Sequence, residues 1–248
     1  MTRQIGDLNG CELKFHERRP IDAGRAREQH RQYEELLRRL GVEVLSLPPE
    51  PALPDSVFVE DTALVLPEIA LILPMGAPSR RPETERIASA LAPFREIHRL
   101  DGPGTVDGGD ILRIGHTLYV GRSSRTNTEG IESLRRALEP LGYSVQAVSI
   151  QGCLHLKSAC TEAGDGLLLA NPERVDLSCW RNMEILRVPP EEPDACNVLR
   201  VGSALVASAC FPRTLESLQA RGLDVYPIDN SEILKAEGAL TCTSLLFD

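Results

Sequence analysis

A unit of two short strands joined at a glycine turn recurs along the chain, and this repetition constrains the fold more than any other feature. The sequence ILRIG at 111–115, followed by LYV at 118–120, has a counterpart in VLRVG at 198–202, followed by LV at 205–206. Two further hairpins are predicted over 55–73 and 155–170, and a strand over 240–247 would complete the set.

Amphipathic helices alternate with these hairpins. Apolar residues at three- and four-residue spacing predict helices over 24–40, 82–91 and 129–141, and shorter ones over 213–221 and 231–236. Short β-like segments follow at 42–47, 96–100, 144–150, 184–188 and 223–228. The pattern predicts an α/β protein of five comparable units, at intervals of roughly 40–50 residues. Because one such unit cannot bury its apolar face alone, we expect the five to pack radially around a common centre.

Length, composition and charge limit the classes of protein that remain. The chain has 248 residues, of which 42% are hydrophobic and 25% charged, and no linker-like stretch interrupts it. These values are typical of a globular protein, and we expect one domain over 1–248. The net charge of -9 argues against nucleic acid or an anionic membrane as the main partner, because both require a cationic face.

The seven cysteines are scattered and include no C-x-x-C pair, which fits neither a disulfide framework nor a zinc site. No apolar run approaches the roughly 20 residues needed to span a bilayer. The polar N-terminus also lacks the apolar core of a signal peptide. We therefore expect a cytoplasmic protein with no membrane partner and no metal.

Polar residues in otherwise apolar surroundings fall at the starts of the predicted hairpins. Equivalent points of a radial repeat converge in space, so acids, an imidazole and a thiol from distant segments are predicted to share one pocket. The residues are Glu60, Asp61, Asp107, Asp110, His155, Cys242 and, with less weight, Asn197.

Each of these signals also has an ordinary structural interpretation. A lone histidine such as His155 is more often a hydrogen-bonded core residue than a catalyst, and Cys242 resembles an apolar filler of a strand. Asp107 and Asp110 flank two glycines and could serve a turn alone. The combination of the residues is therefore more informative than any one of them.

Six short motifs together resemble one known family. They are DSVFVED at 55–61, GAPSRR at 76–81, DGGD at 107–110, SRTN at 124–127, LHLKS at 154–158 and LTC at 240–242. In this order they resemble the dimethylarginine dimethylaminohydrolases of the guanidine-modifying pentein superfamily, over about residues 20 to 248. The resemblance implies a five-bladed α/β propeller with pseudo-five-fold ββαβ repeats. It also implies hydrolysis of Nω-methylated arginine to citrulline and a methylamine, without a cofactor.

The resemblance also implies roles for individual residues. Cys242 would be the nucleophile, His155 the general acid and base, and Asp107 the carboxylate that orients His155. Glu60 and Asp61 would bind the guanidinium group. This set of residues suits hydrolysis of a guanidinium group, because a planar cation must be paired with carboxylates before its central carbon can be attacked. The bound cation would also favour the Cys242 thiolate, which would then form a covalent S-alkylthiouronium intermediate.

The amino-acid end of the substrate would meet a second set of residues. By the resemblance, Asp55 would bind the α-ammonium group, and Arg80 and Arg125 the α-carboxylate. The N-terminal region, residues 1–18, departs most from the family pattern. Within it, residues 11–16, here called the flap segment, occupy the place of a mobile flap that closes over the substrate, and their bulky KFH run is unusual there.

The sequence is also compatible with other functions. The same chemistry could act on arginine, agmatine or another N-substituted arginine, or the amidino group could pass to an amine acceptor instead of water. A non-catalytic pentein that serves as a binding module is a third alternative, but it would have no reason to retain Cys242, His155, Glu60 and Asp61 together. The expected partner is a small guanidino amino acid, and a homodimer is compatible with the sequence.

Overall fold

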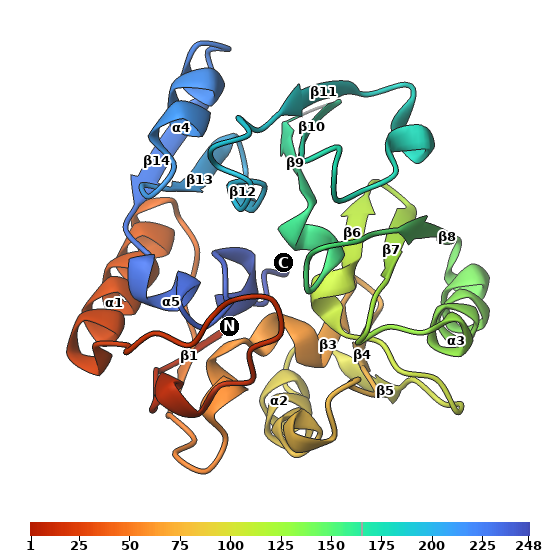
Figure 1. Cartoon of the computed structure of the whole chain (residues 1–248). Helices are drawn as coiled ribbons and strands as arrows, with labels where there is room; N and C mark the ends of the chain where they lie inside the picture. The colour runs from red at the N-terminus through yellow and green to blue at the C-terminus, as the bar shows by residue number, and fades with distance from the viewer. Residues whose placement is uncertain (165) are drawn as a thin grey trace.

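A computed structural model, which describes residues 1–164 and 166–248, contains five small sheets arranged in a ring (Figure 1). Four of these sheets have three strands and the fifth has two. Helices α1 (Ala23–Arg39), α2 (Glu83–Leu91), α3 (Thr128–Leu138) and α4 (Pro212–Gln219) lie on the outside of the ring, and both chain termini lie near its centre. The predicted five-bladed α/β propeller is confirmed.

The three-stranded blades repeat one pattern, in which the first two strands are antiparallel and the third runs parallel to the middle strand. The strands of the four blades are β3 (Ala63–Val65), β4 (Ile69–Ile72) and β5 (Glu96–Arg99); β6 (Ile111–Ile114), β7 (Thr117–Arg122) and β8 (Ser144–Ser149); β9 (Cys160–Gly164), β10 (Leu167–Ala170) and β11 (Glu184–Arg187); and β12 (Val198–Val201), β13 (Ala204–Ser208) and β14 (Asp224–Ile228). In three of them an α-helix precedes the last strand, which is the predicted ββαβ order.

The fifth blade is built from both ends of the chain. Strand β1 (Thr2–Arg3) pairs in parallel with β2 (Ser46–Leu47), and Thr2 also bridges Ser244 in antiparallel orientation. The predicted strand over 240–247 is wrong, because Thr241–Thr243 forms a 3-10 helix, η9. The predicted strand over 42–47 is likewise reduced to β2, since β1 offers only two residues for pairing.

Side-chain caps fix where the longer helices begin. Asp22 accepts a hydrogen bond from the backbone N–H of Arg25 at 3.0 Å and so starts α1. Asn127 does the same for α3, accepting from Gly130 at 2.8 Å, and also accepts from the N–H of Thr105 at 3.0 Å. The second contact anchors the loop before α3. The short helix α5 (Ser231–Leu234) packs against α1.

Apolar side chains join each blade to the next around the whole ring. One cluster connects the first and second blades, and equivalent clusters connect the others in turn until α1 and the two termini close the circle. Representative residues, in ring order, are Leu71 with Leu118, Leu112 with Leu168, Leu169 with Leu205, Val206 with Leu37, and Leu245 with Ile72. Each buried leucine contributes about 1.5–3 kcal/mol relative to exposure. The blades therefore depend on their neighbours, as the repeat predicted.

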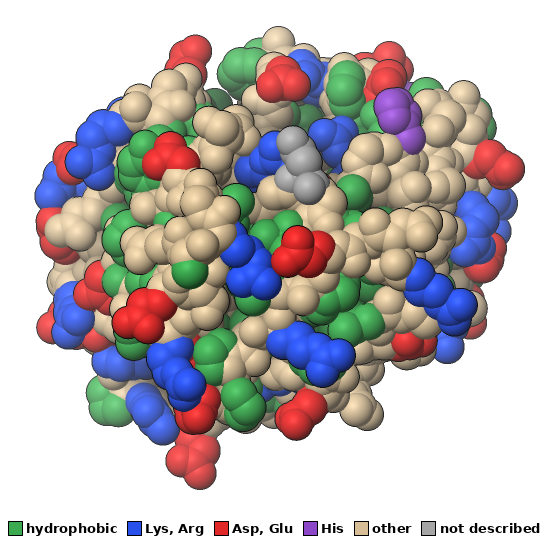
Figure 2. All heavy atoms as spheres, turned by 90° about the horizontal axis from the view of Figure 1, so that it is seen from above, with side chains coloured by type: hydrophobic (Ala, Val, Ile, Leu, Met, Phe, Trp, Pro, Cys, Tyr) green, Lys and Arg blue, Asp and Glu red, His purple; other side chains and the backbone are tan. Residues whose placement is uncertain are grey.

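Acidic and basic side chains are interspersed over the face shown in Figure 2, which presents no continuous basic surface. Among the described residues, no helix has both the length and the apolar character needed to cross a membrane.

Candidate active site

The predicted catalytic residues lie in, or directly before, short 3-10 helices at the starts of four of the five blades. Glu60 and Asp61 belong to η3 (Val59–Thr62), and Cys242 to η9. Asp107 directly precedes η5 (Gly108–Asp110), and His155 directly precedes η7 (Leu156–Ser158). Helix η3 contacts both η5 and η9, and η5 contacts η7, so the four segments meet at the centre of the ring.

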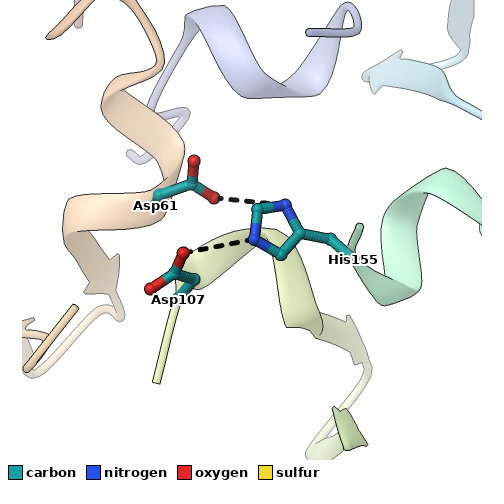
Figure 3. A group of neighbouring side chains, drawn as sticks. All are labelled: Asp61, Asp107 and His155. Atoms are coloured by element: carbon teal, nitrogen blue, oxygen red, sulfur yellow. Dashed lines mark hydrogen bonds and ion pairs between the residues drawn. The ribbon is translucent and has the colours of Figure 1, made fainter. Parts of the chain in front are cut away.

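The two ring nitrogens of His155 face two carboxylates (Figure 3). Its Nε2 is 3.2 Å from Oδ2 of Asp107, and its Nδ1 is 3.8 Å from Oδ1 of Asp61. Burial lowers the pKa of His155, but the carboxylates of Asp61, Asp110 and Asp107 outweigh it and raise the pKa to about 9. The imidazole is therefore protonated at neutral pH and can act as a general acid.

Backbone contacts hold both acids of the DGGD motif in place. Oδ1 of Asp107 accepts the N–H of Gly76 at 2.8 Å, which leaves Oδ2 for the imidazole. Asp110 accepts the backbone N–H of Leu156 at 2.9 Å, and Leu156 follows His155 directly. Burial raises the pKa of Asp110 to about 6 although the His155 imidazolium opposes this change. Asp107 thus orients the ring, while Asp110 positions the backbone beside it.

The two glycines of this motif allow the segments to approach each other. A Cβ atom at Gly109 would lie 2.6 Å from Nδ1 of His155 and 2.7 Å from Oδ1 of Asp61. At Gly108 it would lie 2.0 Å from the carbonyl oxygen of Glu60. No side chain fits at such distances, so the glycines serve the assembly of the site and not a turn alone.

Asp61 and Arg80 form a buried ion pair. Nη1 of Arg80 is 2.7 Å from Oδ2 of Asp61, and the rest of the guanidinium group contacts the Glu83 carboxylate and backbone carbonyls. Burial raises the pKa of Asp61, but the charges of His155 and Arg80 outweigh it, so the pKa is lowered and the group is anionic. Arg80 therefore holds Asp61 in this structure, and its predicted contact with the substrate carboxylate stays a prediction.

Glu60 is held by two residues from other blades. Its Oε1 is 2.5 Å from Nζ of Lys157, and its Oε2 accepts a hydrogen bond from the Thr241 hydroxyl at 2.8 Å. Burial raises the pKa of Glu60, and the Lys157 ammonium group counteracts this shift. Asn197 accepts the backbone N–H of Thr241 at 3.0 Å, which links Glu60 to the segment that carries Cys242.

The Cys242 thiol is half-buried and packs against an apolar cluster that includes Val57, Phe58 and Ile233. Burial raises the pKa of this thiol, and the carboxylates of Glu60 and Asp61 raise it further. These effects favour the neutral thiol over the thiolate. A cation bound by the same carboxylates would remove this repulsion and favour the thiolate.

Asp55 and Arg125 are brought together through the flap segment. The backbone N–H of Glu12 donates to Oδ2 of Asp55 at 3.2 Å, and the Glu12 carboxylate lies 3.0 Å from Nη2 of Arg125. Nη1 of Arg125 is buried and has no hydrogen-bond partner among the described residues. Both residues therefore contact the same residue of the flap segment, and their predicted roles toward the substrate stay predictions.

Several contributing residues had little or no signal of their own in the sequence. Lys157 and Thr241 lie inside the quoted motifs LHLKS and LTC, but nothing marked them as ligands of Glu60. Asn197 had less weight than the other polar residues. Glu12 was not singled out, because its contacts depend on the path of the flap segment and not on a local pattern.

Among the described residues, Asp61, Asp107 and His155 form a group that could hold a metal ion, with ligand atoms all within 4.8 Å of one another. The contacts inside this group already pair the imidazole with carboxylates, and Arg80 neutralises Asp61. We therefore interpret the group as an oriented acid and base.

The raised pKa of His155 predicts a pH dependence of stability. Because the pKa rises from 6.5 in the unfolded chain to about 9 in the fold, the imidazolium stabilises the fold fully below pH 6.5 and loses this effect as the pH rises through 9. The contribution is on the order of 3 kcal/mol. Urea unfolding of the wild type and His155→Gln at pH 6.5 and pH 9 measures it. The difference in unfolding free energy between the two proteins should be smaller at pH 9 than at pH 6.5. An equal difference at both pH values would contradict the assignment.

Comparisons with known proteins show which family this chain resembles. A family model described as N,N dimethylarginine dimethylhydrolase, eukaryotic, matches residues 6–159. An N(G),N(G)-dimethylarginine dimethylaminohydrolase of Streptomyces coelicolor is 42% identical over 232 residues, which cover 92% of this chain and 88% of the relative.

Two solved structures are similar along nearly their whole length. One is the dimethylarginine dimethylaminohydrolase of Pseudomonas aeruginosa, a cysteine-to-serine mutant complexed with citrulline, with a TM-score of 0.94, 35% identity, and coverage of 99% of this chain and 97% of that one. The other is a histidine-to-glycine mutant of such an enzyme, an adduct with S-methyl-L-thiocitrulline, with a TM-score of 0.95, 35% identity, and coverage of 99% and 98%.

The ring of five blades, with a thiol, an imidazole and paired carboxylates at its centre, defines an enzyme of the guanidine-modifying pentein superfamily. Within this superfamily, the sequence motifs suggested one particular family, and the comparisons confirm that assignment. The chain belongs to the dimethylarginine dimethylaminohydrolase family.

Proposed function

We propose that this enzyme hydrolyses monomethylated and asymmetrically dimethylated L-arginine to citrulline and methylamine or dimethylamine. The observation that carries the proposal is the meeting of η9, which bears Cys242, with η3, which bears the two acids Glu60 and Asp61, beside the His155–Asp107 pair. Citrulline in a relative with 35% identity supports the same product.

In the first half of the reaction, the guanidinium cation binds to Glu60 and Asp61 and offsets their effect on the thiol. The Cys242 thiol loses its proton to solvent, and the resulting thiolate attacks the central carbon of the guanidinium group and forms a neutral tetrahedral adduct. The His155 imidazolium then donates its proton to the substituted nitrogen. Methylamine or dimethylamine leaves, and an S-alkylthiouronium remains on the sulfur.

In the second half, neutral His155 removes a proton from a water molecule that attacks the same carbon. As this second adduct collapses, the C–S bond breaks and the proton of the adduct's hydroxyl group passes to the sulfur, which releases citrulline and restores the thiol. Asp107 keeps the imidazole oriented in both halves. The bound geometry lowers the barrier because nucleophile and carbon are held together before reaction.

The amino-acid end of the substrate gives the enzyme its specificity in this proposal. Asp55 binds the α-ammonium group, and Arg125 binds the α-carboxylate through its fork of donors. We also propose that Arg80 contributes to binding of the substrate α-carboxylate, as predicted from the sequence, in addition to its ion pair with Asp61. Burial raises the pKa of Asp55, and the Arg80 charge opposes that rise.

A panel of guanidino compounds tests the proposal. Nω-methyl-L-arginine should be turned over with release of methylamine, whereas agmatine, which lacks the α-carboxylate, should be roughly 30- to several-thousand-fold poorer in kcat/KM. Ureido product formation and the mass of the released amine measure this. Equal turnover of the two compounds would refute the arginine pocket but not the Cys242 and His155 chemistry. Transfer of the amidino group to an added amine would identify an amidinotransferase instead.

Arg125→Ala is the matching variant. It should narrow the preference for methylarginine over agmatine, because the α-carboxylate would lose its bidentate partner. If this variant kept the discrimination of the wild type, Arg125 would not bind the carboxylate.

We also propose that residues 1–248 act as a single catalytic domain in the cytoplasm. The free cysteines support the location, because Cys11, Cys153, Cys160 and Cys196 are buried without disulfide bonds, and disulfides are rare in cytosolic proteins. Whether two copies associate stays a prediction, which light scattering of the purified protein tests directly.

A further inference from the structure

Glu12 makes a distinctive set of contacts in the flap segment. Its backbone N–H donates to the Asp55 carboxylate at 3.2 Å. Its own carboxylate pairs with Nη2 of Arg125 at 3.0 Å through one oxygen and accepts a hydrogen bond from the Ser79 hydroxyl through the other. In the proposed complex, Asp55 binds the α-ammonium group of the substrate and Arg125 binds its α-carboxylate. Glu12 offers the same two residues an N–H donor and a carboxylate.

The guanidinium group of Arg125 has more hydrogen-bond donors than Glu12 engages. The residue is 9% exposed, and its Nη1 has no hydrogen-bond partner among the described residues. A buried guanidinium donor without a partner is costly, and a planar carboxylate can engage Nη1 and Nη2 together. Glu12 fills one arm of this fork, and the ligand that the fork fits is an α-carboxylate.

We propose that Glu12 is an internal placeholder for the α-carboxylate of the substrate, which competes with it for Arg125 and so sets the affinity for amino-acid substrates. This inference rests on the proposed function of Arg125 and Asp55 and deepens it. Binding exchanges one carboxylate for another on Arg125 and sends the Glu12 side chain to water.

The surroundings of Glu12 make this exchange inexpensive. Its side chain is 43% exposed, and an ion pair at such a position contributes little to stability. The tip of the flap segment is held separately, since the backbone N–H groups of Lys14, Phe15 and His16 all donate to the Glu237 carboxylate. The Glu12 side chain can therefore swing out while Glu237 keeps the tip of the flap segment in place.

Competition has a definite kinetic consequence. When the binding-competent state is only a fraction of the population, the apparent dissociation constant rises by the inverse of that fraction. Glu12→Gln keeps the size of the side chain but removes the charge that pairs with Arg125. The variant should therefore bind carboxylate-bearing substrates more tightly, whereas a residue that only closed the flap segment would, when replaced, weaken binding.

The experiment compares Nω-methyl-L-arginine with its α-carboxamide, in which the carboxylate is replaced by a neutral amide. In Glu12→Gln, KM for methylarginine should fall roughly two- to ten-fold, with kcat changed less than about two-fold. KM for the carboxamide should stay within about two-fold of the wild type, because it does not compete for the charge of Arg125. Glu17→Gln removes the same charge from a nearby exposed position and should change neither value.

An unchanged or higher KM for methylarginine in Glu12→Gln would overturn the inference, and so would an equal fall for both compounds. The effect should also vanish in the Arg125→Ala background, where there is no guanidinium group to compete for. If Arg125→Ala loses discrimination while Glu12→Gln has no effect, the proposed function stands and the placeholder fails. If the wild type does not turn over methylarginine, calorimetric binding of L-citrulline and its carboxamide decides the same question: tighter citrulline binding by Glu12→Gln supports the placeholder, and unchanged binding refutes it.

Discussion

Replacement of Cys242 by serine is expected to lower kcat/KM for methylarginine by about 10⁴-fold or more. The reason is the acidity of the nucleophile. A bound guanidinium cation can offset the carboxylates of Glu60 and Asp61 enough to favour a thiolate, but an alkoxide is far harder to generate. Citrulline formation from methylarginine, followed over long incubation, measures the loss.

The fold should survive this change, because serine has the same shape as cysteine with one smaller atom and the residue is only half-buried. Thermal unfolding of Cys242→Ser should therefore stay close to that of the wild type. Cys210→Ser is the matched control, since Cys210 is exposed and lies outside the site, and it should keep full activity. Substantial turnover by Cys242→Ser would remove the nucleophile assignment.

The five-fold repetition was predictable because each blade leaves its own signature in the sequence. Hairpins such as 111–120 and 198–206 repeat the same apolar pattern, and each unit must bury that pattern against the next. The fifth blade was less predictable. It joins β1 to a segment more than 200 residues away through Thr2 and Ser244, and no local pattern encodes so distant a pairing.

The convergence of the predicted catalytic residues was also predictable, but their local structure was not. Glu60, Asp61 and Cys242 were expected at the starts of strands and lie in 3-10 helices instead. A 3-10 helix of three or four residues has no periodicity that a sequence pattern can reveal. The role of Gly109 likewise depends on the approach of His155 from another blade, which only the three-dimensional structure shows.

Arg80 illustrates a further limit. Its motif suggested a ligand of the substrate carboxylate, whereas its guanidinium group contacts Asp61 and Glu83 in this structure. Burial raises the pKa of Glu83 to about 7, and the Arg80 charge opposes that rise. A charged residue in a motif can therefore serve the substrate directly or serve the residue that binds it, and the sequence alone does not distinguish the two.

His155→Ala should slow steady-state turnover of methylarginine by about 10²- to 10⁴-fold. In this variant the rate of adduct formation should depend on the leaving group of the substrate, whereas the rate of adduct hydrolysis should not. An amine must be protonated before it leaves, so without His155 methylarginine should form the covalent adduct slowly. S-methyl-L-thiocitrulline expels a thiolate, which needs no proton, so the adduct should form readily. Because hydrolysis of the adduct requires a base in both cases, the S-alkylthiouronium on Cys242 should accumulate with the second compound.

Mass spectrometry of acid-quenched enzyme distinguishes these stages. In His155→Ala treated with S-methyl-L-thiocitrulline, most of the protein should carry the adduct, whereas wild-type enzyme should clear it and Cys242→Ser should never form it. His98→Ala is the matched control, because His98 is exposed and, in the part of the chain that the structure describes, pairs with Glu96 alone, at 2.9 Å; it should behave as the wild type. Rapid clearance of the adduct by His155→Ala would mean that another group activates the water. The Asp107 carboxylate, already 3.2 Å from the imidazole, would then be the group to replace next.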